Sequence, residues 1–134
     1  MNINIRGRLF DLSKPKVMGI LNLTPDSFYD GGVHNEINKI EDHVNKMVND
    51  GMDILDIGGY SSKPGAKNIS VDEELSRVIP ILKHIRKIFP ELVISIDTFR
   101  SKIASASLNE GADIINDISG GTLDKNMMLS LIHI

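Results

Sequence analysis

Short apolar segments alternate with segments of helical periodicity along most of the chain, and this alternation limits the folds it can adopt. The apolar segments run almost without polar interruption, as in strands buried on both faces, and lie at 16–23, 53–59, 92–97 and 113–118. Helices are predicted at 35–50, from 70 onward, at 100–110 and at 124–132. Strands that alternate with helices over short connections are typical of a parallel sheet, so we expect an α/β fold.

Glycine, proline and capping residues mark the ends of these elements. Residues 3–12 have the pattern of a short hairpin, with Gly7 near its turn. Gly51 follows the first helical segment and is a suitable stop for it. Ser70 and Glu73 have the spacing of a capping box, and Pro80 is expected to kink the helix that they begin.

An internal repeat narrows the architecture. Residues 49–55 (NDGMDIL) recur as 109–115 (NEGADII), and each copy joins a helix end, a glycine and a strand start. A repeat of paired βα units favours a (βα)8 TIM barrel over a doubly wound sheet. A whole barrel needs about 250 residues, so the 134 residues of this chain would form about half of one.

We therefore expect a single partial domain over 1–134, in which a hairpin at 3–12 precedes about four βα units over 16–134. A closed barrel has no sheet edges, whereas half a barrel leaves open ones. This predicts either a fragment of a longer protein or a chain that must associate. The segment 127–134 (MMLSLIHI) has no terminating signal and no polar end, which favours a fragment.

Composition excludes several classes of function. The net charge of −3 argues against a nucleic-acid partner. The absence of cysteine excludes disulfides and thiolate metal sites and is consistent with a reducing cytoplasm. We expect neither a signal peptide nor a membrane partner, because no apolar stretch approaches the length of a membrane span.

Polar side chains occur near the C-terminal ends of the predicted strands. They share the parity of apolar neighbours on the same strands, and they are Asn22, Asp56, Asp97 and Asn116. If these faces point into a barrel, the four meet at its C-terminal mouth, where active sites of this fold lie. Each residue alone could equally be a hydrogen-bonded core group, and Asp56 could only brace the others. An unpartnered buried amide at Asn22 would cost a few kcal/mol, so it is expected to meet a ligand or an internal partner.

Polar loops frame the same mouth. The first, at 24–32, mixes carboxylates, hydroxyls and aromatic rings. The second, at 58–65, offers hydroxyls and the ammonium of Lys63, which suit phosphate binding, although a solvated surface loop has a similar composition. The histidines have no metal-ligand spacing.

Four motifs together resemble dihydropteroate synthase: MGILNLTPDSFYDGG, DIGGYSSKPGA, SIDT and IINDISGG. The resemblance covers residues 14–124 and corresponds to the N-terminal half of that family's (βα)8 barrel. It implies that 4-aminobenzoate displaces diphosphate from (7,8-dihydropterin-6-yl)methyl diphosphate, with Mg²⁺ assisting, to give dihydropteroate for folate biosynthesis. In this family sulfonamides compete with the aminobenzoate, so the resemblance implies a sulfonamide target, and it also implies a homodimer in the complete enzyme.

The resemblance assigns roles to individual residues. The implied catalytic residues are Asp97, Asn22 and Lys63, of which Asn22 is also the metal ligand. The implied substrate-binding residues are Ser62, Asp97, Asn116, Ile118, Phe28 and Pro64. Asp97 and Asn116 would accept and donate hydrogen bonds along the pterin edge, Ser62 and Lys63 would lie near the diphosphate and the aminobenzoate, and Phe28 and Pro64 would close over the aminobenzoate ring.

The match departs from the family in two respects. Ser62 stands where many members have Thr, and Lys63 stands where many have Arg. A lysine at that position keeps the positive charge but loses the bidentate fork of a guanidinium. The family's second half, with another pterin-binding Asp, a Lys and a basic cluster, is absent from these residues. Two alternatives follow: a non-catalytic half-barrel that binds pterin or only associates, and the pterin-binding domain of a corrinoid methyltransferase.

Overall fold

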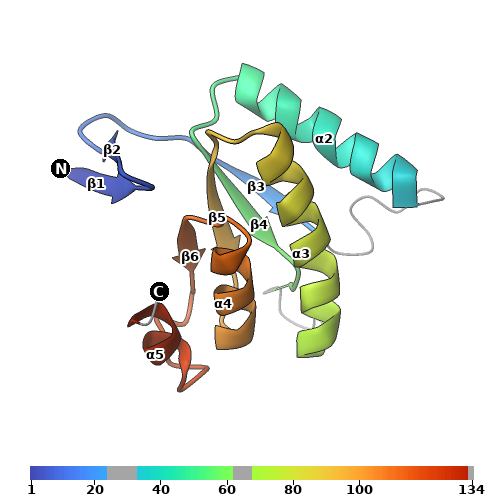
Figure 1. Cartoon of the computed structure of the whole chain (residues 1–134), viewed down its shortest axis with the longest axis vertical. Coiled ribbons are helices and arrows are strands. Elements are labelled where there is room, and N and C mark those ends of the chain that lie inside the picture. Colours follow the sequence, from blue (N-terminus) through green and yellow to red (C-terminus); the bar gives the residue numbers. More distant parts are fainter. Residues whose placement is uncertain (24–32, 62–67, 133–134) are drawn as a thin grey trace.

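A computed structural model describes residues 1–23, 33–61 and 68–132 of the chain. Its centre is a parallel sheet of four strands in the order β3-β4-β5-β6 (Figure 1). The strands are β3 (Met18–Asn22), β4 (Ile54–Gly58), β5 (Val93–Asp97) and β6 (Ile114–Asn116). Neighbouring strands follow each other in sequence, as in consecutive βα units, and this confirms the predicted α/β class.

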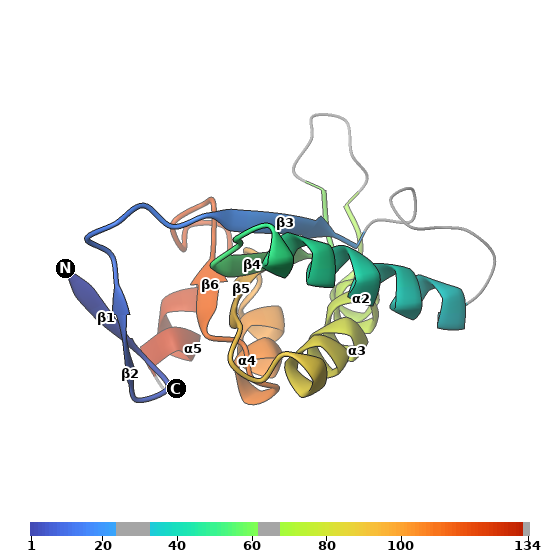
Figure 2. The same cartoon turned by 90° about the horizontal axis from the view of Figure 1, so that it is seen from above.

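The helices lie on one side of this sheet (Figure 2). They are α2 (Val33–Asn49), α3 (Val71–Ile88), α4 (Ser101–Asn109) and α5 (Met127–Ile132). The core between the two layers is formed by the helix-facing strand residues and the apolar faces of the helices, including Leu21, Ile57, Ile96, Val44 and Leu82, each 0% exposed. The period of two along each strand therefore places one set of side chains in the core and leaves the alternate set on the opposite face.

The internal sequence repeat is also a structural repeat. Gly51 and Gly111 both have φ of +103°, a left-handed conformation that favours glycine, and end α2 and α4. Asp53 then accepts a hydrogen bond from the backbone N–H of Val17 at 2.8 Å, and Asp113 accepts one from that of Ile94 at 2.9 Å. In each copy, the glycine stops a helix and the aspartate ties the next strand to the strand before it.

The predicted cap of α3 is confirmed. Ser70 Oγ accepts from the backbone N–H of Glu73 at 3.1 Å, which satisfies one of the free donors at the helix start. The Glu73 carboxylate pairs with Arg77 at 2.7 Å, one turn later in the helix. The helix continues through Pro80 to Ile88.

The predicted hairpin is confirmed as β1 (Asn2–Ile5) paired with β2 (Arg8–Asp11), with Arg6 and Gly7 at its turn. Arg6 attaches it to the N-terminal end of the sheet: Nη1 donates to the carbonyl of Pro90 at 2.7 Å, and Nε lies 2.7 Å from Asp113 Oδ1. The hairpin thus covers the end of the strands opposite to the predicted mouth.

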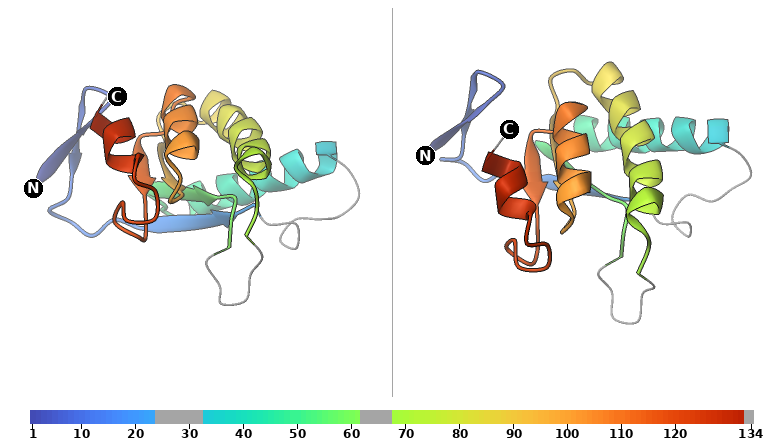
Figure 3. Two further views of the ribbon diagram at one scale, coloured as in Figure 1. Left: turned by 90° about the horizontal axis from the view of Figure 1, so that it is seen from below. Right: turned by 60° about the horizontal axis from the view of Figure 1, so that its bottom comes forward.

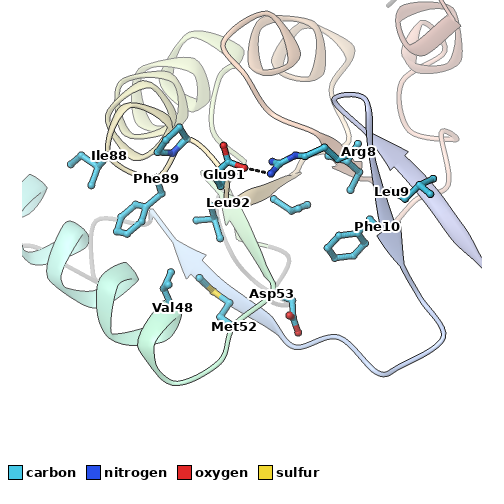
Figure 4. A pocket seen from close by; sticks show the side chains of 13 residues that line it. Arg8, Leu9, Phe10, Val48, Met52, Asp53, Ile88, Phe89, Glu91 and Leu92 are labelled. Atoms are coloured by element: carbon cyan, nitrogen blue, oxygen red, sulfur yellow. Dashed lines mark hydrogen bonds and ion pairs between the residues drawn. The ribbon is translucent and has the colours of Figure 1, made fainter.

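A cavity of about 540 Å³ lies between the hairpin and the starts of β4 and β5 (Figure 4). Its walls are mainly apolar and include Phe10, Met52 and Phe89. The charged side chains Arg8 and Glu91 form an ion pair with each other. We interpret this cavity as an imperfect contact between the hairpin and the sheet, remote from the strand ends where polar groups gather.

One sequence-based expectation is wrong. The apolar pattern of 16–23 predicts a strand buried on both faces, but β3 buries only its helix-facing side, and Met18 and Ile20 are 41% and 53% exposed on the other. The reason is that β3 is an edge strand and no helix covers the second face of the sheet within the described residues (Figure 3). We call this second face the inner face, because it would line the barrel. No helix in the described parts of the chain is long and apolar enough to cross a membrane.

Candidate active site on the inner face

The strand register sorts the inner-face residues into rows. An upper row, at the C-terminal ends of the strands, contains Asn22, Gly58, Asp97 and Asn116. A lower row, one step down each strand, contains Ile20, Asp56, Ser95 and Ile114. The expected convergence is confirmed for the upper row. Asp56 shares the face but lies one row below the mouth.

Asp56 supports the upper row from below. It is 3% exposed, and its Oδ2 accepts from Asn116 Nδ2 at 3.4 Å. Its Oδ1 and the neighbouring Ser95 Oγ are buried without a hydrogen-bond partner in the described structure. Buried polar atoms are normally paired, so these two atoms leave capacity for a water molecule or a ligand group on the inner face.

Asp97 is the carboxylate at the centre of the upper row. Tyr60 Oη donates to its Oδ1 at 3.2 Å. Burial raises the pKa of Asp97 above its ordinary value, the negative charge of Asp56 raises it further, and the hydrogen bond from Tyr60 lowers it. Gly58 lies beside Asp97, and a Cβ added there would approach Asp97 Oδ2 to 3.5 Å. The missing side chain keeps the surface open next to the carboxylate.

A buried ion pair anchors the segment that follows Asp97. Glu74 on α3 is 0% exposed, accepts from Thr98 Oγ1 at 2.7 Å and pairs with Arg100 Nη1 at 3.0 Å. Arg100 Nη2 also donates to the carbonyl of Ile69 at 2.6 Å. Burial raises the pKa of Glu74, and the bonds from Thr98 and Arg100 act against that effect. The pair therefore joins α3, and Ile69 two residues before its first residue, to the segment that follows β5.

Two predicted site residues take positions that differ from expectation. Asn22 is exposed at the end of β3, so its amide is not the buried group that the apolar run suggests. Ile118 does not continue β6, which ends at Asn116, and its side chain is 64% exposed. The strand ends there because Asp117 closes a turn, accepting from the backbone N–H groups of Ser119 at 2.8 Å and Gly121 at 3.0 Å.

The remaining predicted site residues, Phe28, Ser62, Lys63 and Pro64, lie outside the described residues. The described residues contain no group of three or more His, Cys, Asp or Glu side chains arranged to hold a metal ion. The described part of the candidate site is therefore an acidic and amide-bearing surface made of Asp97, Asn116 and Asp56.

Sequence reasoning misses the groups that support Asp97. In the sequence, Tyr60 is only one member of a polar loop, and Glu74 and Arg100 have the pattern of ordinary helix-start or surface charges. A signal for Glu74 is present, because it lies on the apolar side of α3, one residue before Leu75 and four before the buried Val78. No local pattern indicates that Tyr60 contacts Asp97, because the two belong to different βα units.

Comparisons with known proteins agree with this geometry. A family described as "Pterin binding enzyme" matches residues 18–133. The dihydropteroate synthase of Escherichia coli K12 is 50% identical over 118 residues, 88% of this chain and 42% of that protein. A structure of Xanthomonas albilineans dihydropteroate synthase with 4-aminobenzoic acid has a TM-score of 0.88 and 37% identity, covering 98% of this chain and 48% of that one. One of the Yersinia pestis enzyme in a sulfonamide drug complex has a TM-score of 0.80 and 43% identity, over 91% and 44%.

The chain thus spans about half the length of these relatives, at 42% of the Escherichia coli protein and 48% of the Xanthomonas chain. The matches confirm the resemblance to dihydropteroate synthase and the prediction that these residues form half of a larger α/β barrel. They cover the sheet, its helices and the upper row. The chain belongs to the pterin binding enzyme family.

Proposed function

We propose that residues 1–134 form the pterin-facing half of a dihydropteroate synthase. The observation that carries the proposal is the upper row, in which Asp97 and Asn116 are register partners at the C-terminal end of a parallel sheet. A carboxylate oxygen accepts hydrogen bonds, and an amide both accepts and donates. Together they match the alternating donors and acceptors along the edge of a pterin ring.

The reaction needs little covalent chemistry from the protein. The amine nitrogen of 4-aminobenzoate attacks the methylene carbon of the pterin, the bond from that carbon to the diphosphate oxygen breaks, and the attacking nitrogen loses one proton. Positive charge develops on the pterin as the diphosphate leaves. The Asp97 carboxylate, fixed in place before the reaction, would stabilise that charge without reorganisation.

Asp56 and Ser95 lie beneath the bound ring in this proposal. The Asn116 amide is held by Asp56 at 3.4 Å, which orients it for the substrate. Asp56 Oδ1 and Ser95 Oγ, unpartnered among the described residues, would accept or share a water under the pterin. The lower row therefore positions the groups of the upper row.

We also propose Mg²⁺ as the cofactor, with Asn22 as a ligand. The Asn22 amide is exposed at the mouth of the sheet and makes no side-chain hydrogen bond within the described structure, so its carbonyl oxygen is available. A single protein oxygen fits Mg²⁺, which keeps water molecules and substrate phosphate oxygens in its shell. When bound, the ion would neutralise charge on the departing diphosphate.

The other parts of the proposal follow from the family resemblance. Ser62 and Lys63 would contact the diphosphate and the aminobenzoate, and Phe28 and Pro64 would cover the aminobenzoate ring. Sulfonamides would compete at the same place. We expect a homodimer in the cytoplasm, with small molecules as the only substrates.

The test is an assay of the complete gene product that contains these residues. Purified protein is incubated with the pterin diphosphate, 4-aminobenzoate and Mg²⁺, and we expect dihydropteroate and diphosphate in equal amounts. In parallel, Asn116→Ala is expected to weaken binding of the pterin diphosphate about tenfold, because the ring loses a paired donor and acceptor. Asn109→Ala removes an exposed amide at the end of α4 and serves as the matched control.

Each result separates the candidate functions. Pterin binding without dihydropteroate formation would favour a non-catalytic pterin-binding protein. Methyl transfer from a methylated pterin to a corrinoid would favour the methyltransferase alternative. Absence of pterin binding, with Asn116→Ala indistinguishable from Asn109→Ala, would reject all three and leave the alternative of a half-barrel that only associates.

A further inference from the structure

Tyr60 approaches Asp97 from the loop that follows β4. Its Oη donates to Asp97 Oδ1 at 3.2 Å. The other oxygen, Oδ2, lies beside Gly58, where no side chain intervenes. The two carboxylate oxygens therefore have different surroundings, one bonded to a phenol and the other next to the open upper row.

The Tyr60 ring is itself held in place. It makes a T-shaped contact with the ring of Phe99, with centroids 5.2 Å apart and planes at 88°. The guanidinium of Arg100 lies 5.0 Å from the centroid of the same Phe99 ring and is fixed by buried Glu74 at 3.0 Å. A phenol supported in this way loses little further freedom when it bonds to Asp97, which favours a well-defined geometry.

Tyr60 also differs in kind from the other titratable groups that face Asp97. Those groups are acidic: Asp56 on β4, Glu74 on α3 and Asp117 after β6. Burial and these negative charges raise the pKa of Asp97, and the hydrogen bond from Tyr60 acts in the opposite direction. Burial and the negative charge of Asp97 also raise the pKa of Tyr60, which favours the protonated phenol that donates this bond.

We propose that Tyr60 is a positioning residue of the synthase, whose hydroxyl holds Oδ1 of Asp97 and leaves Oδ2 free to accept a hydrogen bond from the pterin. The proposal rests on the proposed function, because it concerns the same carboxylate. Tyr60 need not touch the substrate. It fixes the orientation of the carboxylate and favours its anionic form.

The experiment compares wild-type complete gene product with Tyr60→Phe, which retains the ring on Phe99 and removes only the hydroxyl. The measured quantity is kcat/KM for the pterin diphosphate as a function of pH. We expect kcat/KM near neutral pH to fall about tenfold, the effect of losing one hydrogen bond to a charged group. We also expect the acid limb of the profile to move to higher pH, because the anionic form of Asp97 loses a stabilising donor.

A double-variant cycle distinguishes positioning from a loss of structure. In an Asp97→Asn background, Tyr60→Phe is expected to change kcat/KM less than about twofold, because the anion on which it acts is gone. An equal loss in both backgrounds would overturn the proposal. Substitution of Tyr60 by 3-fluorotyrosine keeps the shape and strengthens the donor, so the acid limb is expected to move to lower pH. This second variant tests the proposal should Tyr60→Phe fail to fold.

A readout independent of synthase activity separates this proposal from the proposed function. The carboxyl carbon of Asp97 is followed by ¹³C NMR during a pH titration, in wild type and in Tyr60→Phe. A titration midpoint that is higher in the variant supports the contact even if the wild type forms no dihydropteroate. A midpoint that does not move, in a protein with unchanged circular dichroism, rejects the role of Tyr60 whatever the activity.

Discussion

On the helix-facing side of the sheet, Leu21, Ile57 and Ile96 are fully buried in a continuous apolar core. On the inner face of the same strands, Ile20 is 53% exposed, and Asp56 and Ser95 carry buried atoms without partners among the described residues. The residues of the two faces alternate along the same strands. One face of the sheet is a finished core, and the other holds unused hydrogen-bonding capacity.

This difference separates stability from function within the same strands. Most of the buried apolar residues lie between the sheet and the helices, and on the inner face the apolar packing is confined to the N-terminal end, where Ile54 and Val93 are buried with Ile5 of the hairpin. The inner face can therefore contain carboxylates and amides, because the apolar core offsets the free energy that their burial costs. Substitutions on the helix-facing side should therefore lower stability, whereas substitutions in the upper row of the inner face should lower activity.

The largest effect is expected from Asp97→Asn in the complete gene product. The variant keeps the size and shape of the side chain but loses the charge that would stabilise the developing positive pterin. We expect kcat/KM to fall about 10²–10³-fold with the melting temperature unchanged within a few degrees. Steady-state kinetics and calorimetry check this, with Asp50→Asn, an exposed carboxylate at the end of α2, as control. Unchanged kinetics would remove Asp97 from the mechanism.

The placement of Asp97 is the part of the site that the sequence could predict. Strand parity depends only on the period of two, so the amino-acid sequence alone assigns Asn22, Asp56, Asp97 and Asn116 to one face. The register then refines the prediction, because pairing of Gly58 with Asp97 places Asp56 one row lower. The helix ends at Gly51 and Gly111 could also be predicted from the sequence. Helices commonly end in a left-handed backbone conformation that favours glycine, and both residues adopt it.

The contacts that support Asp97 could not be predicted in the same way. The bond from Tyr60 joins residues 37 positions apart and depends on how a loop leaves β4. Glu74 and Arg100 are 26 positions apart and carry charges that a sequence pattern assigns to solvent. The exposure of Ile20 escapes prediction for a different reason: a strand with an apolar pattern on both sides becomes half-exposed when it lies at the edge of the sheet.

A matched pair of isoleucines tests the contrast in stability between the two faces. In residues 1–134, Ile57→Ala is expected to lower the free energy of unfolding by about 3 kcal/mol, because it opens a cavity in the core. Ile20→Ala, on the same type of strand but half-exposed, should cost about 1 kcal/mol or less. Urea unfolding followed by circular dichroism gives both values. An equal cost at Ile20 would contradict the exposed inner face and indicate that another copy of the chain covers it.

The pH dependence of stability tests the buried ion pair of Glu74 and Arg100, which anchors the segment that follows Asp97. Because burial raises the pKa of Glu74 in the folded state, its protonated form is favoured there, so stability is greatest below the unfolded pKa. This contribution to stability is lost as the pH rises through the pKa that Glu74 has in the folded state. The variant Glu74→Gln lacks this loss, so we expect the difference in unfolding free energy between variant and wild type to shift in favour of the variant between acid and neutral pH. A shift in the opposite direction would mean that Arg100 outweighs burial.

The smallest effects are expected from one substitution made at two serines. Ser70→Ala removes the N-cap of α3 and should lower the free energy of unfolding by about 1 kcal/mol, since the backbone N–H of Glu73 loses its acceptor. Ser95→Ala removes a fully buried hydroxyl that has no partner in the described structure, so it should raise that free energy by up to about 1 kcal/mol. Denaturant titrations of both variants in residues 1–134 measure the two values. Opposite signs would indicate that Ser95 Oγ on the inner face forms no hydrogen bond in the folded protein. A loss at Ser95 similar to that at Ser70 would show that its hydroxyl already has a partner, such as an ordered water shared with Asp56 Oδ1.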